Sequence, residues 1–214
     1  MDAIGIWGAT SGRGNGIGRS LVGELTKDAE TVVHVFGRSE EKVNELCGTF
    51  PSVRGSMVWN LKDEARVESY QRYLGESGIR SIISTVGLGV GNPIPFLTQM
   101  ELQGMIEANL VSPFMILKYS LLPMKQLNGG RIIMFGSITS FQPQQGACGY
   151  AATKMALRGL VESTRRELRT GFQSVSVHGM YTGPVSKVGI ASIVDAVSYL
   201  LRLPYGVHAD VILD

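Results

Sequence analysis

The 214-residue sequence lacks the features expected of a metalloprotein, a membrane protein or a nucleic-acid-binding protein. It contains only two cysteines, Cys47 and Cys148, without metal-ligand spacing, so we expect no metal site and a reduced, cytoplasmic environment. No apolar run is long enough to span a membrane, and the first residues lack a basic-then-apolar secretion signal, so we expect no membrane partner. The formal net charge is +2 and no dense basic stripe occurs, which argues against a nucleic-acid partner.

Short β-rich runs alternate with helical patterns along nearly the whole chain. The strands are predicted at Ala3–Trp7, Thr31–Phe36, Val53–Trp59, Ser81–Val86, Arg131–Phe135, Ser174–Met180 and Asp210–Leu213. The helices are predicted near Ile17–Lys27, Glu40–Phe50, Asp63–Glu76, Leu102–Leu127, Tyr150–Thr170 and Ile190–Leu203. The strands are apolar nearly throughout, as expected of strands that are covered on both faces. We therefore predict an α/β fold in one domain over residues 1–214, with a Rossmann-like, doubly wound parallel sheet of about seven strands and helices on both faces.

A glycine-rich turn, GATSGRGNGIG over residues 8–18, connects the first predicted strand to the first predicted helix. Glycines let the backbone approach a pyrophosphate closely, and the following helix offers its unpaired N–H groups to the phosphates. No Gly-Lys-Ser/Thr follows, so the turn is not a P-loop. The expected cofactor contacts in this segment are Gly8, Thr10, Ser11, Arg13, Gly16, Ile17 and Gly18.

The end of the second predicted strand bears on the choice of dinucleotide. An acidic residue there would bind the ribose 2′-hydroxyl and select NAD(H), but the sequence has Gly37-Arg38-Ser39. Arg38 can pair with a 2′-phosphate, Ser39 can add a hydrogen bond, and Arg13 is a second candidate partner. We therefore expect NADP(H) rather than NAD(H).

Tyr150 and Lys154 are spaced so that both side chains lie on one face of a helix, and Ser137 follows an apolar strand upstream. A phenol has a pKa of about 10, which is too high for proton exchange at neutral pH. A neighbouring ammonium favours the phenolate and is expected to lower that pKa. The Ser137 hydroxyl could hold a substrate oxygen near the phenol.

Together with other motifs, these residues resemble the short-chain dehydrogenase/reductase family over nearly the whole chain. The motifs that carry the resemblance are the turn at Gly8–Gly18, Gly37-Arg38, Asn60, Ser84-Thr85-Val86-Gly87, Asn109, Gly136-Ser137, Tyr150-Ala-Ala-Thr-Lys154 and Thr182-Gly183-Pro184-Val185.

The resemblance implies a role for each catalytic candidate. Tyr150 would be the general acid/base, and Lys154 would lower its pKa and bind the nicotinamide ribose. Ser137 would orient the carbonyl, and Asn109 would hold a water that links Lys154 to solvent. The resemblance also implies cofactor contacts at Asn60, Leu61, Gly87, Tyr150, Lys154, Gly183 and Val185.

Two of the departures from the family pattern bear directly on the site. Ser84-Thr85-Val86-Gly87 stands where the family has Asn-Asn-Ala-Gly, which removes one amide that braces the sheet. Only Pro184–Gly189 separates the sixth strand from the last helix, where the family has a long substrate lid. We therefore expect an open site, in which Leu88–Phe96 and Ile138–Gly149, or a neighbouring subunit, distinguish substrates.

The long helices carry apolar residues on more than one face, and the resemblance implies that they pack against a partner in a homodimer or homotetramer. Three arginines, Arg165, Arg166 and Arg169, cluster on one of these helices, and we interpret them as a solvated or subunit-facing surface.

Two functional hypotheses follow. The first is an NADP(H)-dependent oxidoreductase that interconverts a carbonyl and an alcohol by hydride transfer, acting on a small-molecule or carrier-tethered substrate, with Tyr150 as general acid/base. The second is an NADP(H)-binding sensor or scaffold with little turnover, which the shortened lid motivates. Replacement of Tyr150 by phenylalanine would separate them, because it abolishes the function of an enzyme and not that of a binder.

Overall fold

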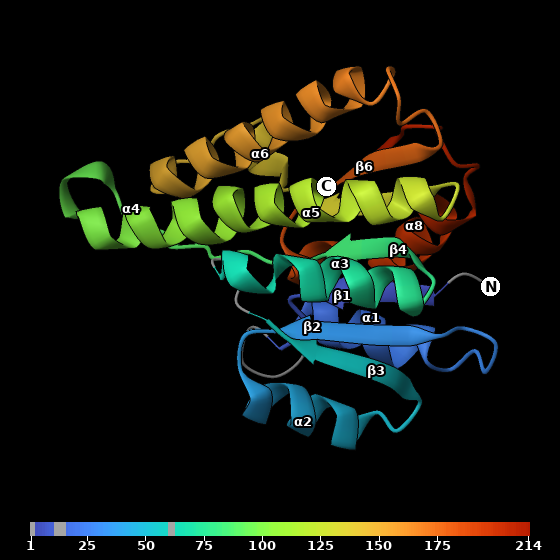
Figure 1. Ribbon diagram of the computed structural model, residues 1–214. Helices are drawn as coiled ribbons and strands as arrows, with labels where there is room; N and C mark the ends of the chain where they lie inside the picture. Colours follow the sequence, from blue (N-terminus) through green and yellow to red (C-terminus); the bar gives the residue numbers. More distant parts are fainter. Residues whose placement is uncertain (1–2, 11–15, 60–62) are drawn as a thin grey trace.

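The computed structural model describes residues 3–10, 16–59 and 63–214 (Figure 1). The described residues form one sheet of seven parallel strands: β1 (Ala3–Trp7), β2 (Val33–Gly37), β3 (Val53–Val58), β4 (Ile79–Ser84), β5 (Gly130–Phe135), β6 (Val175–Thr182) and β7 (Asp210–Leu213). Their order is β3-β2-β1-β4-β5-β6-β7, so the chain reverses its direction of winding between β1 and β4. The predicted doubly wound parallel sheet is confirmed.

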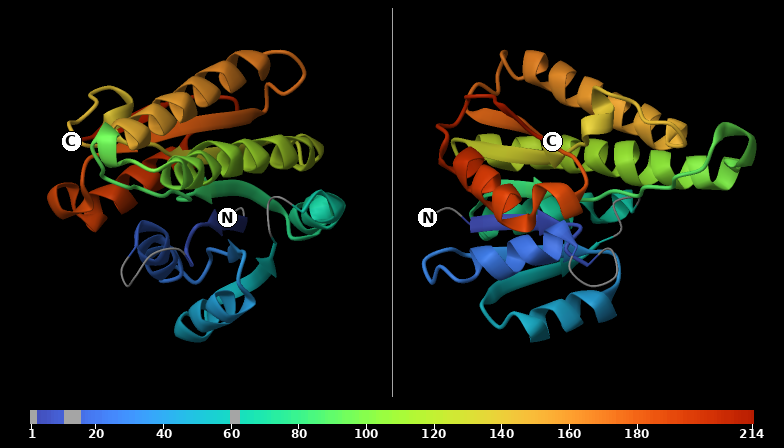
Figure 2. Two further views of the ribbon diagram at one scale, coloured as in Figure 1. Left: turned by 90° about the vertical axis from the view of Figure 1, so that its left-hand side faces the viewer. Right: turned by 180° about the vertical axis from the view of Figure 1, so that it is seen from behind.

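Helices cover both faces of the sheet (Figure 2). They are α1 (Ile17–Leu25), α2 (Glu40–Thr49), α3 (Val67–Glu76), α4 (Gln99–Ile106), α5 (Ser112–Gln126), α6 (Cys148–Glu167), α7 (Val185–Val188) and α8 (Ile190–Arg202). One core packs α3, α5 and α6 against the sheet, through residues such as Leu74, Ile116 and Leu157. The opposite core packs α1, α2 and α8 through Leu21, Leu46 and Val197. Because both faces are covered, the buried strand residues are mostly apolar, with polar exceptions such as His34, Ser81 and His178.

The long helix predicted at Leu102–Leu127 is longer and less regular than its pattern indicated. It begins at Gln99, where Thr98 and Glu101 form a capping box that the T-x-x-E spacing could have identified. Between α4 and α5, Glu107–Val111 form a π-helical turn. This turn carries Asn109, and π turns are frequent at functional sites.

Aromatic rings fill the core next to the glycine turn. Trp7, the last residue of β1, stacks on Phe36 with 5.0 Å between ring centroids, and Trp59 stacks on Tyr70 at 4.6 Å. The Trp7 indole N–H donates to the Tyr70 hydroxyl at 3.3 Å, and that hydroxyl lies 3.0 Å from the Ser120 Oγ. Trp7 is therefore a core residue that anchors the strand leading into the turn.

Arg165 was interpreted from the sequence as a solvated or subunit-facing residue, and this was wrong. Its guanidinium donates to the carbonyls of Val177 and Ala209 and to the Asp210 carboxylate. It therefore ties the edge strand β7 to β6 from the side of α6. Arg166 and Arg169 are exposed.

The connection from β6 to α8 is short, as predicted. It contains the single turn α7, followed by Gly189 at φ 79°, a left-handed conformation that favours glycine. Among the described residues, no helix combines the length and the apolar character needed to cross a membrane.

Candidate functional site

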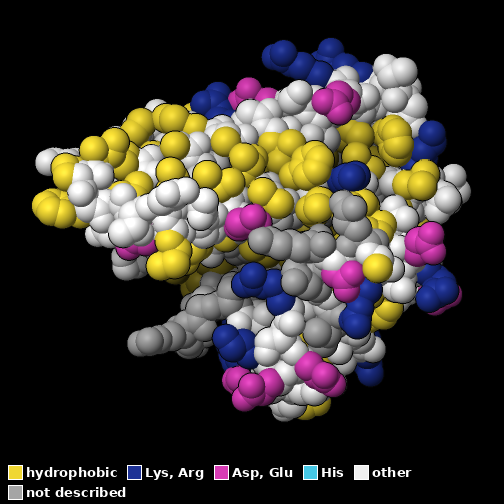
Figure 3. Space-filling view, turned by 60° about the vertical axis from the view of Figure 1, so that its left-hand side comes forward, with side chains coloured by type: hydrophobic (Ala, Val, Ile, Leu, Met, Phe, Trp, Pro, Cys, Tyr) yellow, Lys and Arg dark blue, Asp and Glu magenta, His cyan; other side chains and the backbone are white. Residues whose placement is uncertain are grey.

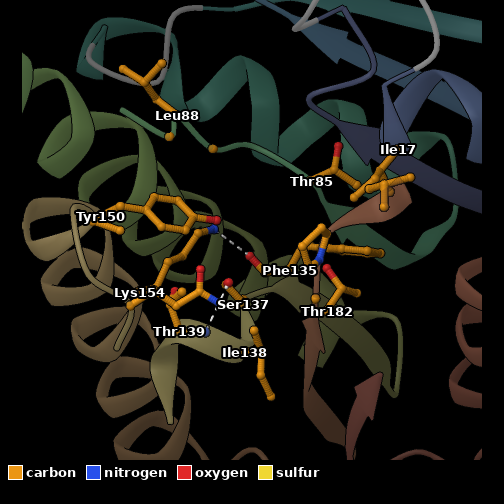
Figure 4. Close-up of a pocket in the computed structure, with 18 residues that line it drawn as sticks. Ile17, Thr85, Leu88, Phe135, Ser137, Ile138, Thr139, Tyr150, Lys154 and Thr182 are labelled. Atoms are coloured by element: carbon orange, nitrogen blue, oxygen red, sulfur yellow. Dashed lines mark hydrogen bonds between the residues drawn. The ribbon is translucent and has the colours of Figure 1, made fainter. Parts of the chain in front are cut away.

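A cavity of about 380 Å³ lies at the carboxyl ends of the central strands, on the side of the reversal in strand order (Figure 4). Parallel α/β sheets bind ligands at this position. The described residues that line it are Ile17, Thr85, Gly87, Leu88, Gly89, Phe135, Gly136, Ser137, Ile138, Thr139, Gln144, Ala147, Tyr150, Lys154, Thr182, Gly183, Pro184 and Val185.

Thr85 packs into the glycine turn at one end of the cavity. Its N–H and its hydroxyl both donate to the Trp7 carbonyl at 3.0 Å. A Cβ added at Gly8 would lie 2.7 Å from the Thr85 Oγ1, and one added at Gly18 would lie 2.5 Å from the same atom. Gly8 also has a φ of 89°. The turn therefore requires glycine at both positions. Thr85, which stands where the family has an asparagine, links the end of β4 to the end of β1 through its bonds to Trp7.

The start of α1 can receive an anion. Gly16 occupies the N-cap position, and because glycine has no side-chain oxygen it cannot cap the N–H groups of the first turn. Ile17 faces the cavity and Gly18 is buried against Thr85. This arrangement fits the phosphates of a dinucleotide. Two expected contacts, Ser11 and Arg13, lie outside the described residues.

Arg38 follows β2 directly and is exposed. The next residue, Ser39, is the N-cap of α2, and its Oγ accepts from the Lys42 N–H at 3.4 Å. Thr10 reaches this region, because a Cβ on Gly37 would lie 3.0 Å from the Thr10 Oγ1. The glycine turn and the end of β2 are thus adjacent, as one dinucleotide site requires. Asn60 and Leu61 lie outside the described residues.

Tyr150 and Ser137 meet at the other end of the cavity (Figure 4). Ser137 is buried, and its Oγ accepts from the Thr139 N–H at 3.2 Å. Burial raises the pKa of the Tyr150 phenol, and hydrogen bonding with Ser137 acts in the opposite direction. The sequence predicted a lowered pKa for Tyr150. The structure gives the opposite direction, because desolvation of the phenolate is the largest effect.

Lys154 lies one turn after Tyr150 in α6, and only 4% of its surface is exposed. Its Nζ donates to the Phe135 carbonyl at 3.0 Å and lies 5.8 Å from the centre of the Tyr150 ring. Burial lowers the pKa of Lys154 to about 8. The ammonium is therefore held beside the phenol by the end of β5.

Asn109 is fully buried, and its side chain makes three hydrogen bonds within the protein. Its amide group donates to the Leu88 carbonyl at 2.8 Å and to the Thr153 Oγ1 at 2.9 Å, and its Oδ1 accepts from the Leu88 N–H at 2.8 Å. Both side-chain N–H donors are used within the protein, so the water role that the resemblance implies would fall to an acceptor oxygen of Asn109. Asn109 also joins the segment after β4 to α6.

Three further candidates surround these groups. A Cβ on Gly87 would lie 3.2 Å from the Asn109 Oδ1 and 3.3 Å from the Lys154 Nζ, so a larger residue would crowd both. Gly183 follows β6 and bonds to the Leu213 carbonyl, and Val185 begins α7. Both line the cavity on the side of the short lid.

Neither Thr153 nor Gln144 was predicted individually from the sequence, although Gln144 lies in Ile138–Gly149, a segment expected to distinguish substrates. Thr153 lies within Tyr150-Ala-Ala-Thr-Lys154, where its position directly before the lysine was the available signal. Gln144 lines the cavity from the segment before α6, and no sequence pattern distinguishes it from Gln142 and Gln145.

Comparison with known proteins shows the family and the fold. The model of the short chain dehydrogenase family matches residues 9–195. A 3-oxoacyl-[acyl-carrier-protein] reductase of Escherichia coli is 27% identical over 179 residues, which cover 83% of this chain and 73% of the relative. Serine dehydrogenase of Escherichia coli has the same fold, with a TM-score of 0.85 at 23% identity and coverage of 99% of this chain and 96% of that one.

A second solved structure is an alcohol dehydrogenase of the archaeon Thermococcus sibiricus complexed with 5-hydroxy-NADP. Its TM-score is 0.83 at 23% identity, with coverage of 99% of this chain and 95% of that one. The family match extends from the glycine turn through α6, which carries Tyr150 and Lys154, and into α8. The chain therefore belongs to the short-chain dehydrogenase family and is an oxidoreductase that acts on alcohol and carbonyl groups.

Proposed function

We propose that the chain is an NADP(H)-dependent oxidoreductase that interconverts a carbonyl and an alcohol, with Tyr150 as the general acid/base. The supporting observation is that Tyr150, Ser137 and Lys154 line one cavity, which also reaches Ile17 at the start of α1. The cofactor, when bound, supplies the hydride. Gly8, Gly18 and the first turn of α1 would hold its phosphates, and Lys154, Gly183 and Val185 would surround its reactive end.

Three side chains can donate the proton and stabilise the negative charge that develops on the substrate oxygen. Because burial raises the pKa of Tyr150, the phenol is protonated at neutral pH and can donate its proton to a carbonyl oxygen under reduction. The Ser137 Oγ accepts from the Thr139 N–H, so its hydroxyl proton, which also serves the hydrogen bond with Tyr150, can be donated to the same oxygen when a substrate is bound. The Lys154 ammonium then stabilises the phenolate that remains.

The preference for NADP(H) rests on Arg38. It stands exposed at the end of β2, where an acidic residue would repel a 2′-phosphate. The Thermococcus sibiricus alcohol dehydrogenase is complexed with an NADP derivative, which is consistent with this choice.

We further propose a homodimer or homotetramer and a small or carrier-tethered substrate. Exposed hydrophobic residues lie on α4, α5 and α6, namely Met100, Ile106, Phe114, Leu122 and Met155. Figure 3 shows hydrophobic side chains gathered over the part of the molecule that these helices form.

The proposed substrate follows from the short lid and from one relative. The 3-oxoacyl-[acyl-carrier-protein] reductase of Escherichia coli is named for a substrate carried by an acyl carrier protein, and the short lid of this chain leaves room for a substrate tethered in that way.

The direct test is oxidation of NADPH and NADH, followed by absorbance, with a panel of ketones, aldehydes and acyl thioesters. We expect turnover with NADPH that depends on Tyr150. If no panel member is turned over, and the Tyr150→Phe variant keeps the biological activity of the wild type, the chain is instead a cofactor-binding sensor or scaffold.

A further inference from the structure

The catalytic end of the cavity is almost without charge. Among the described residues that line it, Lys154 alone carries a charged side chain. Its ammonium is buried and donates to the Phe135 carbonyl, so it faces the end of β5 and the phenol. The remaining polar side chains of the lining are hydroxyls and the carboxamide of Gln144.

From this inventory we infer that the substrate is an uncharged ketone or alcohol, that Gln144 binds a neutral polar group of it, and that Leu88 contacts an apolar part. The inference rests on the proposed function and names the substrate class of the same site. A carboxylate carried into the cavity with the ketone would lose its water and meet no arginine or unpaired lysine among the described residues of the lining, which is unfavourable.

The wall on the Ser137 side offers neutral hydrogen-bonding groups. The Gln144 side chain is exposed and has no hydrogen-bond partner among the described residues. The Thr139 Oγ1 is buried and also lacks a partner in the described part of the chain. A carboxamide can both donate and accept, so Gln144 suits an ester, amide or hydroxyl group near the reacting carbonyl.

The wall opposite Ser137 presents the apolar side chain of Leu88, whose backbone is fixed by Asn109. In Figure 4, Leu88 lies on one side of Tyr150, and Ser137 and Thr139 lie on the other. The Leu88 backbone is bonded at both its N–H and its carbonyl by Asn109, while 42% of the residue remains exposed. A Cβ on Gly104 would lie 3.4 Å from the Leu88 Cδ2, so this side chain packs over α4. An apolar group of the substrate that packs on the Leu88 side chain would shield this exposed surface from water, which favours binding.

The test compares two stable substrates of similar shape and different charge, 4-oxopentanoate and its ethyl ester, with NADPH and the full-length protein at pH 7. We expect kcat/KM for the ester to exceed that for the acid by on the order of 10-fold or more. The Gln144→Arg variant should raise kcat/KM for the acid relative to the ester by a similar factor, because it supplies a cation. Gln145→Arg is the matched control, since Gln145 is exposed and does not line the cavity.

The outcomes separate the inference from the function on which it rests. Wild type that prefers the acid, or uses both equally, overturns the assignment of an uncharged substrate and leaves the oxidoreductase function intact. Equal effects of Gln144→Arg and Gln145→Arg overturn the role of Gln144. If no ketone of any charge is reduced although NADPH binds, the proposed function fails and this inference fails with it.

Discussion

The side-chain amide of Asn109 bonds both backbone groups of Leu88, through contacts of 2.8 Å to its carbonyl and 2.8 Å from its N–H. The same amide donates to Thr153 in the helix that carries Tyr150 and Lys154. The π turn at Glu107–Val111 places Asn109 at this junction. The buried side chain of Asn109 therefore ties the segment that forms one wall of the cavity to α6.

Thr153 should act as a positioning residue within this junction. Its Oγ1 accepts from Asn109 and donates to the Tyr150 carbonyl at 2.8 Å. Thr153→Val removes both bonds and leaves a buried N–H of Asn109 unpaired, at a cost of about 1–3 kcal/mol in the free energy of unfolding. We also expect a higher KM for ketones that contact Leu88. Thr153→Ser keeps the hydroxyl and should restore KM, and equal KM values for all three proteins would contradict the coupling.

Tyr150→Phe should lower kcat by about 10²–10⁴-fold, the range for loss of a general acid/base. NADPH binding, measured by quenching of the Trp7 and Trp59 fluorescence, should be nearly unchanged. Lys154→Ala should weaken both turnover and binding, because the ammonium serves the phenol and the ribose. A Tyr150→Phe variant with near-normal kcat would mean that another group transfers the proton.

Arg38→Asp should reverse or abolish the preference for NADPH over NADH. The pairing of a guanidinium with a 2′-phosphate corresponds to roughly 10–100-fold in Kd, and the new carboxylate would instead bind the ribose hydroxyls. Dissociation constants for both cofactors would be measured by titration. Arg54→Asp changes an exposed arginine of β3 and serves as the control. Wild type that binds NADH more tightly would refute the prediction.

Stability should fall as the solution is acidified below about pH 6.5, the ordinary pKa of histidine. Burial, the largest cause, lowers the pKa of His178 to about 4, and burial also lowers that of His208, with Arg165 adding to both shifts. A folded-state pKa below the unfolded value means that the unfolded chain binds protons first, so stability present above about pH 6.5 is lost as the pH falls toward 4.

The His208 Nδ1 also accepts from the Val177 N–H at 3.1 Å, and protonation would abolish that bond. Urea unfolding between pH 7.5 and 4.5 should show a loss of up to roughly 3 kcal/mol. The His208→Gln variant should show a smaller dependence on pH. A free energy of unfolding that stays constant over this range would contradict the assignment.

Phe114→Asp should dissociate the oligomer, because it places a carboxylate in the exposed hydrophobic surface of α4, α5 and α6. Sedimentation at micromolar concentration would report the change in mass. Tyr199→Asp is the matched control, since Tyr199 is equally large and exposed but lies on α8, away from this surface. A wild-type protein that sediments as a monomer would refute the proposed assembly.

The sequence by itself determined the features that depend on local patterns. β1 and β7 were predicted with their observed bounds. β1 is fully buried, and strands covered on both faces are apolar along their length, whereas β7 is a partly exposed edge strand. The glycine turn was predictable from its position between a strand and a helix. The spacing of Tyr150 and Lys154 placed both on one helical face, which follows from the geometry of the α-helix.

Only the tertiary structure decided the features that depend on burial and on contacts between distant segments. The pKa of Tyr150 is raised because the fold removes water from the phenol, and no spacing reveals that effect. Arg165 bonds to Val177 and Asp210 because α6 packs beside β6, next to the edge strand β7. Asn109 meets Leu88 and Thr153 across 21 and 44 residues of sequence. Each of these properties arises from groups that the folded chain brings together and withdraws from solvent.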